Sequence, residues 1–168
     1  MNDRHSQIVA CIPNLRRYAR ALMGNSSAAD DLVQDTLERA WKKLSLWRSD
    51  CSMRAWLFGI MHNLHIDQRR RHKSNIVPID DNHFRIPTRP TQNDNLEVDD
   101  LTIALQQLSQ EHREVLLLVT LEDMSYGEIA VTLGIPTGTV MSRLARAREK
   151  LRGILAAGEQ TKPLKVVK

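Results

Sequence analysis

The segment from Ser125 to Arg152, SYGEIAVTLGIPTGTVMSRLARAREKLR, constrains the fold more than any other part of the chain. Ser125 followed by Glu128 has the spacing of a capping box, which begins a helix. Gly134 suits the left-handed conformation that ends such a helix, and Pro136 suits the start of the next one. Apolar residues then recur at spacings of four, three and four, at Val140, Leu144, Ala147 and Leu151. The sequence therefore predicts two helices joined by a tight turn.

The second of these helices carries mostly basic residues on the faces outside its apolar stripe. Its bases outnumber its one acid, Glu149, by five to one, and they are Arg143, Arg146, Arg148, Lys150 and Arg152. A tight turn followed by one-sided positive charge is typical of a helix-turn-helix whose second helix enters the major groove of DNA. The alternative interpretation is an ordinary helical hairpin with a solvated basic face.

The composition of the whole chain fits a helical protein with an anionic partner. The 168 residues carry a net charge of +4, and 42% of them are hydrophobic although only 4% are aromatic, which favours small aliphatic cores. Cys11 and Cys51 form no CxxC pair, so we expect no disulfide scaffold, no thiolate zinc site and a reducing cytoplasmic location. We expect no signal peptide, and no apolar run approaches the ~20 residues that span a bilayer.

Helical periodicity recurs along the chain on both sides of one polar segment. We expect helices over residues 8–23, 28–46, 96–108 and 110–121, and a helix from Met53 that breaks or kinks at Asn63. The first has Arg16, Arg17 and Arg20 on its solvent side, and Ser26 or Ser27 is expected to cap the second.

The polar segment divides the chain into two parts. Residues 74–95 contain three prolines and no helical period, which predicts a flexible linker, and the tail 154–168 is expected to fray after Gly153. The expected fold class is all-α, with two small helical bundles at residues 6–73 and 96–153.

Charge is also unevenly distributed within the first bundle. The expected second helix carries acids in its first half, at Asp30, Asp31, Asp35 and Glu38. The helix dipole explains part of this pattern, but not why four acids and Gln34 gather at one end of a basic protein. The run from Asp67 to Lys73 is a dense positive patch that suits phosphates.

These motifs fall into two blocks, over about residues 8–73 and 99–153. The first block contains DDLVQDTLERAWKKL and RAWLFGIMHNLHIDQRRR, and the second contains LSQEHREVLLLVTLEDMSYGEIAVTLGIPTGTVMSRLARAREKLR. In this order they closely resemble regions 2 and 4 of bacterial RNA polymerase sigma factors of the extracytoplasmic-function (ECF) group. The resemblance implies a promoter-specificity subunit that binds core RNA polymerase, catalyses nothing itself and needs no cofactor or metal.

The resemblance also implies sites for individual residues. Region 2 would dock on the clamp helices of the largest polymerase subunit through Asp31, Leu32, Gln34, Asp35 and Glu38, while region 4 would lie at the flap of the second-largest subunit. At the promoter −10 element, Asn63 would contact a flipped base, and phosphates would be held by Arg69, Arg70 and Arg71. The rival interpretation of Asn63 is a mere helix stop.

The −35 element would be read by the helix-turn-helix, through Thr137, Thr139, Ser142, Arg143 and Arg146. Met141 departs from the family, which commonly has Lys or Arg there, so the −35 base preference does not transfer from relatives. The acids from Asp94 to Asp100 could mimic RNA phosphates. The group is usually controlled by an anti-sigma factor, and the first two helices look like its general-stress branch.

Two other classes of function compete with this one. A stand-alone helix-turn-helix regulator would leave the acidic second helix without a role. A metal-dependent enzyme could use His62 and His65, with Asp67 and His72 nearby, but no HExxH motif or nucleophile–base pair accompanies them. We expect these histidines to be polar surface residues beside the DNA-facing helix.

Overall fold

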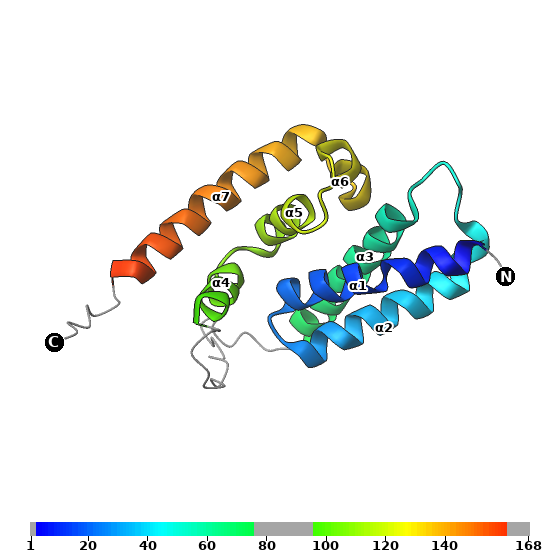
Figure 1. The fold of residues 1–168 in the computed structure, drawn as a ribbon, viewed down its shortest axis with the longest axis horizontal. Coiled ribbons are helices and arrows are strands. Elements are labelled where there is room, and N and C mark those ends of the chain that lie inside the picture. Colours follow the sequence, from blue (N-terminus) through cyan, green and yellow to red (C-terminus); the bar gives the residue numbers. More distant parts are fainter. Residues whose placement is uncertain (1–2, 76–95, 161–168) are drawn as a thin grey trace.

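The structure is a computed structural model, and it describes residues 3–75 and 96–160. These two ranges contain seven α-helices, one short 3-10 helix and no strand, as the all-α prediction requires (Figure 1). No helix in the described ranges combines the length and the apolar character needed to cross a membrane.

The first bundle consists of α1 (Asp3–Met23), α2 (Ser26–Lys43), the 3-10 helix η1 (Leu44–Leu46) and α3 (Met53–Asn75). Gly24 adopts a left-handed conformation between α1 and α2. The cap of α2 is Asn25, whose side-chain oxygen accepts a hydrogen bond from the Ala28 N–H at 3.0 Å, so the prediction of Ser26 or Ser27 was wrong by one or two positions. Asn is as good a capping residue as Ser, so local preference alone does not separate them.

The predicted break at Asn63 is wrong, because α3 runs through it without interruption. The Asn63 side chain is exposed, while Met61 and Leu64 on either side are buried in the core. Packing of these apolar neighbours outweighs the weak helix propensity of a single asparagine. The fourth helix expected after the break is therefore the second half of α3.

The second bundle consists of α4 (Leu96–Gln106), α5 (Gln110–Thr120), α6 (Tyr126–Leu133) and α7 (Thr137–Gln160). The prediction that the chain frays after Gly153 is wrong as far as Gln160, because α7 continues to that residue. Ile154 packs against the core, which gives the extra turns an apolar contact. The rest of the predicted tail, 161–168, lies outside the described residues, as do residues 76–95 of the predicted linker.

The two bundles lie against each other. Helix α1 contacts α4 and α5, α3 contacts α6, and the buried side chains of both bundles belong to one continuous apolar cluster (Figure 1). The sequence predicted both bundles but not this packing.

Candidate nucleic-acid and protein interfaces

The turn between α6 and α7 has the geometry that the sequence predicted. The Ser125 hydroxyl accepts a hydrogen bond from the Glu128 N–H at 3.2 Å, and the Glu128 carboxylate accepts one from the Ser125 N–H at 2.8 Å. This second bond is the main reason why the pKa of Glu128 lies below its usual value. Gly134 ends α6 with φ 65° and ψ 38°. The helix-turn-helix is thus formed by local interactions at both ends of α6.

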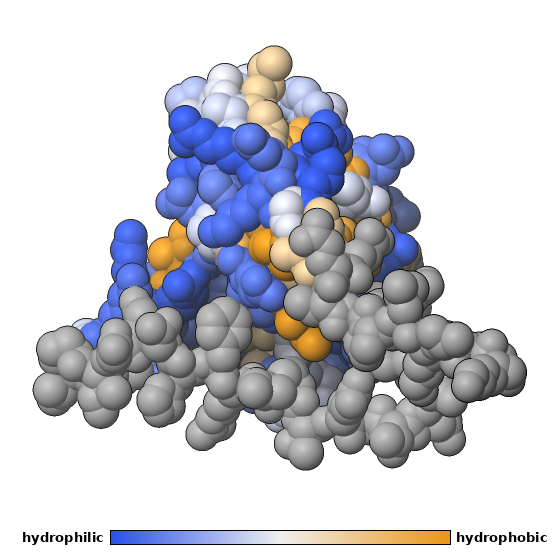
Figure 2. Space-filling model, turned by 90° about the vertical axis from the view of Figure 1, so that its left-hand side faces the viewer, coloured by the Kyte–Doolittle hydropathy of each residue, from blue (hydrophilic) through white to orange (hydrophobic). Residues whose placement is uncertain are grey.

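One side of α7 is buried in the second bundle, and most of the predicted −35 residues lie on its solvent-facing sides. Val140, Leu144 and Ala147 are buried, as the apolar stripe predicted. Thr137, Ser142 and Arg146 are exposed, and Thr139 is half-buried. Figure 2, which faces the C-terminal end of α7, shows a largely hydrophilic described surface there. The face of α7 that remains open is therefore polar and basic.

Arg143 and Ser142 are held by contacts within the bundle. One Arg143 guanidinium nitrogen lies 3.3 Å from a carboxylate oxygen of Glu111 on α5, and the Ser142 hydroxyl donates to the Thr139 carbonyl at 3.1 Å. Arg143 would have to leave Glu111 to contact a base. Arg146 has no such restraint among the described residues and reaches into solvent.

The positive charge of α7 extends to its neighbour α5. Burial lowers the pKa of His112 on α5, and the charge of Lys150 on α7 lowers it further. Arg146 and Arg143 act in the same direction, against the opposing effect of Glu111. A histidine beside this surface thus resists protonation, as expected where the local field already favours an anion.

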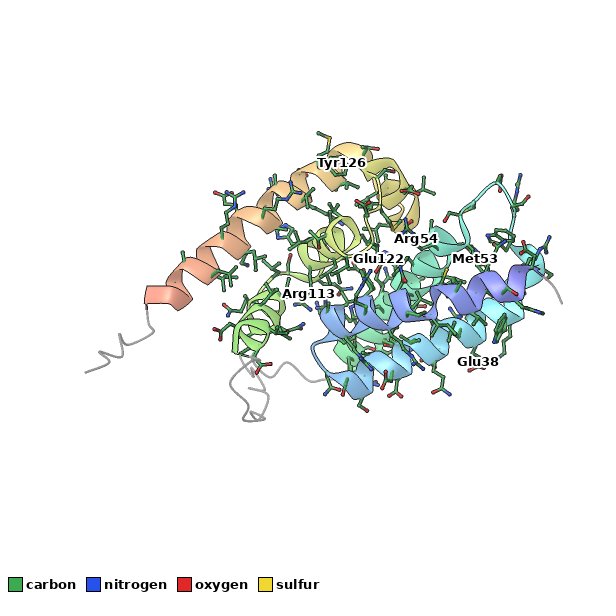
Figure 3. The ribbon with its side chains drawn as sticks, in the orientation of Figure 1. Glu38, Met53, Arg54, Arg113, Glu122 and Tyr126 are labelled. Carbon is green, nitrogen blue, oxygen red and sulfur yellow. The ribbon has the colours of Figure 1, made fainter. Side chains whose placement is uncertain are left out.

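The acidic residues of α2 form an open face on the opposite side of the molecule from α7 (Figure 1). Asp31, Gln34, Asp35 and Glu38 are all exposed, and their spacings of three, one and three place them along one side of the helix. Glu38 points away from the rest of the molecule (Figure 3) and lies 2.6 Å from Lys42, whose hydrogen bond and charge lower the pKa of Glu38. Leu32 is fully buried against the first bundle, so it packs beneath this face and is not itself exposed on it.

The acidic face and the predicted phosphate-binding arginines share one groove, which the sequence did not predict. A groove of about 650 Å³ between α2 and α3 is lined by residues of both sets, including Asp31, Asp35, Arg69 and Arg71. The Gln68 amide of α3 donates to Asp35 at 3.3 Å across the same groove. Arg69, Arg70 and Arg71 are exposed, so they remain open to an anionic ligand.

The two histidines of the HxxH motif are not the surface residues that we expected. His62 is half-buried, and its Nδ1 lies 2.8 Å from a carboxylate oxygen of Glu114 on α5. His65 is buried with no hydrogen-bond partner for its Nδ1, and this burial lowers the pKa of its imidazole. The described residues contain no group of three or more His, Cys, Asp or Glu side chains placed to hold a metal ion.

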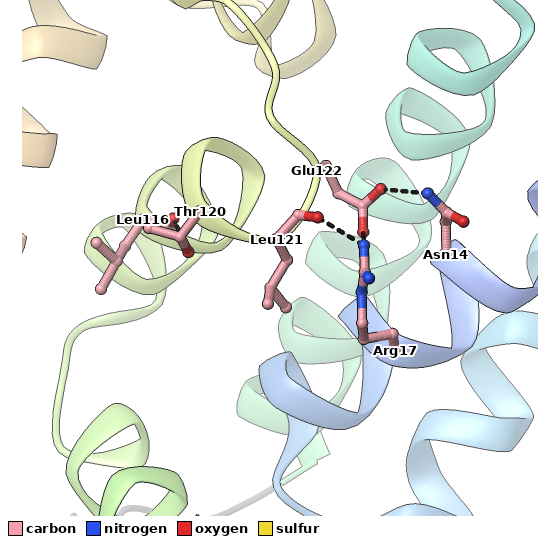
Figure 4. A network of polar contacts seen from close by, with 6 residues as sticks. All are labelled: Asn14, Arg17, Leu116, Thr120, Leu121 and Glu122. Carbon is pink, nitrogen blue, oxygen red and sulfur yellow. Dashed lines mark hydrogen bonds and ion pairs between the residues drawn. The ribbon is translucent and has the colours of Figure 1, made fainter.

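Contacts between the bundles are the structural feature that sequence reasoning missed. Arg17 lies on the solvent side of its helix, as expected, and its guanidinium also bonds to Glu122 in the turn between α5 and α6 (Figure 4). Arg113 of α5 likewise reaches the carbonyl of Leu22 at the end of α1. No local pattern indicates these pairs, because their members are about a hundred residues apart.

Comparison with known protein families matches both blocks of the sequence. Residues 8–62 match the family described as the Sigma2 domain of PhyR, and residues 99–151 match Sigma-70, region 4. The chain is 37% identical over 149 residues to the ECF RNA polymerase sigma factor EcfG of Rhodopseudomonas palustris, covering 88% of this chain and 82% of that protein. It is 39% identical over 154 residues to the ECF RNA polymerase sigma factor SigL of Mycobacterium tuberculosis, covering 89% and 84%.

Solved structures agree with these relatives. The sigma factor RpoE of Bartonella quintana, in complex with the anti-sigma factor NepR, superposes with a TM-score of 0.78 at 32% identity, over 93% of this chain and 98% of that one. CnrH, in complex with the cytosolic domain of CnrY, gives a TM-score of 0.70 at 30% identity, over 92% and 88%. With both regions matched in order, across nearly the full length of these relatives, the chain belongs to the ECF group of RNA polymerase sigma factors.

Proposed function

We propose that this sigma factor binds core RNA polymerase through α2 and places it on promoters by reading the −10 element with α3 and the −35 element with α7. The observation that carries the proposal is the combination of an open acidic face on α2 with a complete helix-turn-helix in one chain. The helix-turn-helix accounts for DNA recognition, and the acidic face needs a basic protein partner.

The proposed polymerase contact is the exposed row of Asp31, Gln34, Asp35 and Glu38. Exposed carboxylates on one helical face can form charge-assisted hydrogen bonds with arginines of a partner, and these bonds set orientation as well as affinity. The clamp helices of the largest polymerase subunit are the proposed partner for this row, and the flap of the second-largest subunit is the proposed partner for the second bundle. Leu32 contributes by fixing α2 in the core rather than by contact.

The proposed −10 contacts lie along the exposed side of α3. The Asn63 amide is exposed and can both donate to and accept from a base edge, while Arg69, Arg70 and Arg71 hold backbone phosphates two turns further along the helix. Since α3 is continuous, Asn63 presents its amide from a rigid helix and not from a break.

The proposed −35 contacts are Thr137, Thr139, Ser142 and Arg146, with Arg143 joining them after it leaves Glu111. Arginine binding to guanine O6 and N7 is the commonest specific contact in the major groove. Met141 is 53% exposed on the same helix, so it is free to touch a thymine methyl group but supplies no charge.

We also propose control by an anti-sigma factor, in the general-stress branch of the group. The similar sigma factor RpoE was solved in complex with the anti-sigma factor NepR, CnrH was solved in complex with the cytosolic domain of CnrY, and residues 8–62 match the Sigma2 domain of PhyR. A protein that blocks core binding should be encoded near this gene and should co-purify from resting cells. If neither search yields such a protein, control by an anti-sigma factor is contradicted.

The polymerase contact is tested by gel filtration of the sigma factor with purified core polymerase. The wild type should co-elute with core, and Asp31→Lys should co-elute much less, because it places a cation in the acidic row. The matched control is Asp3→Lys, which makes the same change at an exposed acid of α1. A stand-alone regulator would bind its DNA equally well without core and would not co-elute with it.

A further inference from the structure

The basic surface of the helix-turn-helix contains an acid that pairs with a residue of the DNA-reading helix. Glu111, in the first turn of α5, has a carboxylate oxygen 3.3 Å from a guanidinium nitrogen of Arg143 on α7. The Glu111 side chain is 65% exposed, while that of Arg143 is only 24% exposed. Arg143 lies between the exposed Ser142 and the buried Leu144, so the ion pair is at the edge where the open face of α7 meets α5.

The surroundings of Glu111 are otherwise basic. Four charged groups act on His112, the next residue of α5, and three of them are the α7 bases Arg143, Arg146 and Lys150. Glu111 is the fourth, and it is the only acid among them. A carboxylate in this place lowers the positive potential that attracts DNA phosphates. Glu111 therefore opposes the charge of α7 at the surface that is proposed to meet DNA.

Contact between Arg143 and DNA exchanges one acceptor of its guanidinium for another. In the free protein the acceptor is the Glu111 carboxylate, and at the −35 element it would be guanine O6 and N7. An ion pair as open to water as this one shifts an equilibrium by up to about fivefold. The released carboxylate is exposed and regains water, so the exchange lowers the affinity for DNA without preventing binding.

From this geometry we infer that Glu111 sets the DNA affinity of the helix-turn-helix by competing with DNA for Arg143. Glu111 is thus a positioning residue, which acts through Arg143. A weaker contact by α7 makes promoter binding depend more on the contacts of the first bundle, because the two sites act together on one DNA molecule. The pairing rests on the ion pair itself, and its effect on DNA binding rests on the proposed function.

Competition binding of the holoenzyme to a promoter that it transcribes tests this inference. Glu111→Gln keeps the length of the side chain and removes its charge, so it should raise the affinity for promoter DNA by about two- to fivefold. The affinity should also fall more steeply with salt, because no released carboxylate takes up a cation when Arg143 binds. The matched control is Glu149→Gln, which removes an exposed acid of α7 itself and should change the affinity by less than about twofold.

A double-mutant cycle shows whether Glu111 acts through Arg143 or only through its own charge. In the Arg143→Ala background, Glu111→Gln should raise the affinity no more than the Glu149→Gln control does, because the arginine that it restrains is absent. The inference is overturned if Glu111→Gln leaves the affinity of the otherwise wild-type protein unchanged. It is also overturned if the substitution raises the affinity by the same factor in both backgrounds.

The cycle separates a failure of this inference from a failure of the proposed function. The difference between the two Glu111→Gln factors judges the competition for Arg143, whatever Arg143→Ala does by itself. Arg143→Ala judges the proposed base contact, since it should lower discrimination at one −35 position, and unchanged discrimination contradicts that contact alone. Circular dichroism on the same proteins should show unchanged helix content, because both substituted side chains lie at the surface or its edge.

Discussion

His65 combines burial with an unpaired ring nitrogen, and this makes stability depend on pH. Burial lowers the pKa of His65 below its ordinary value, so between the two values the unfolded chain binds a proton that the folded chain does not. The free energy of unfolding should therefore be unaffected above about pH 6.5 and fall as the pH drops below it.

Thermal melts of the wild type and His65→Gln at about pH 7.5 and pH 5.5 check this expectation. Between these two pH values the melting temperature of the wild type should fall further than that of the variant, because the variant has no imidazole to protonate at this position. His112 has its pKa lowered too, so the variant keeps part of the dependence. Equal losses in the two proteins would contradict the role given to His65.

Arg146 and Arg148 lie two positions apart on α7, and they should differ in what they contribute. Arg146→Ala should lower discrimination at one −35 position by about 1–3 kcal/mol, the usual value of an arginine–guanine pair. Arg148→Ala is the control, since we expect it at phosphate or solvent, and it should weaken all sequences alike and flatten the salt dependence. Competition binding of the holoenzyme to promoters with single −35 substitutions measures both effects. If both variants discriminate equally between bases, the assignment of a base contact to Arg146 but not to Arg148 is contradicted.

At the scale of elements, α6 and its turn depend on the conformation of one glycine. Gly134 has φ 65°, and a Cβ added there would meet nothing within 4 Å, so Gly134→Ala should destabilise only through the backbone conformation, by about 1–2 kcal/mol. Gly138, inside α7, also has open space around it but no positive φ, so Gly138→Ala should stabilise by about 0.5–1 kcal/mol. Chemical denaturation of both variants measures the change in the free energy of unfolding, which should be negative for Gly134→Ala and positive for Gly138→Ala. Changes of the same sign would contradict this explanation of the turn.

The elements that local sequence determines were predicted well. The capping box at Ser125 and Glu128, the left-handed Gly134 and the stripe of α7 all depend on residues within a few positions of one another. The break at Asn63 was wrong because packing on both sides of that residue holds the helix together. Leu32 is buried although Asp31 beside it is exposed, since neighbouring residues on a helix face different directions.

At the scale of the whole molecule, the sequence predicted two helical bundles but not their contact. Glu122 and its partner Asn14 are 108 residues apart, and neither residue has a local pattern that marks it as part of an interface. The resemblance to sigma factors indicated which role each bundle has, namely polymerase and −10 contacts for the first and −35 contacts for the second. Composition alone does not explain the acidic face of α2.

The central claim is that one chain joins core polymerase to a promoter through α2, α3 and α7. Run-off transcription with purified core RNA polymerase on a library of genomic promoter fragments tests it most directly. We predict discrete transcripts that appear only when the sigma factor is added, that are lost with Asp31→Lys and that persist with Asp3→Lys. Folded wild-type protein that yields no sigma-dependent transcript from any fragment would contradict this claim.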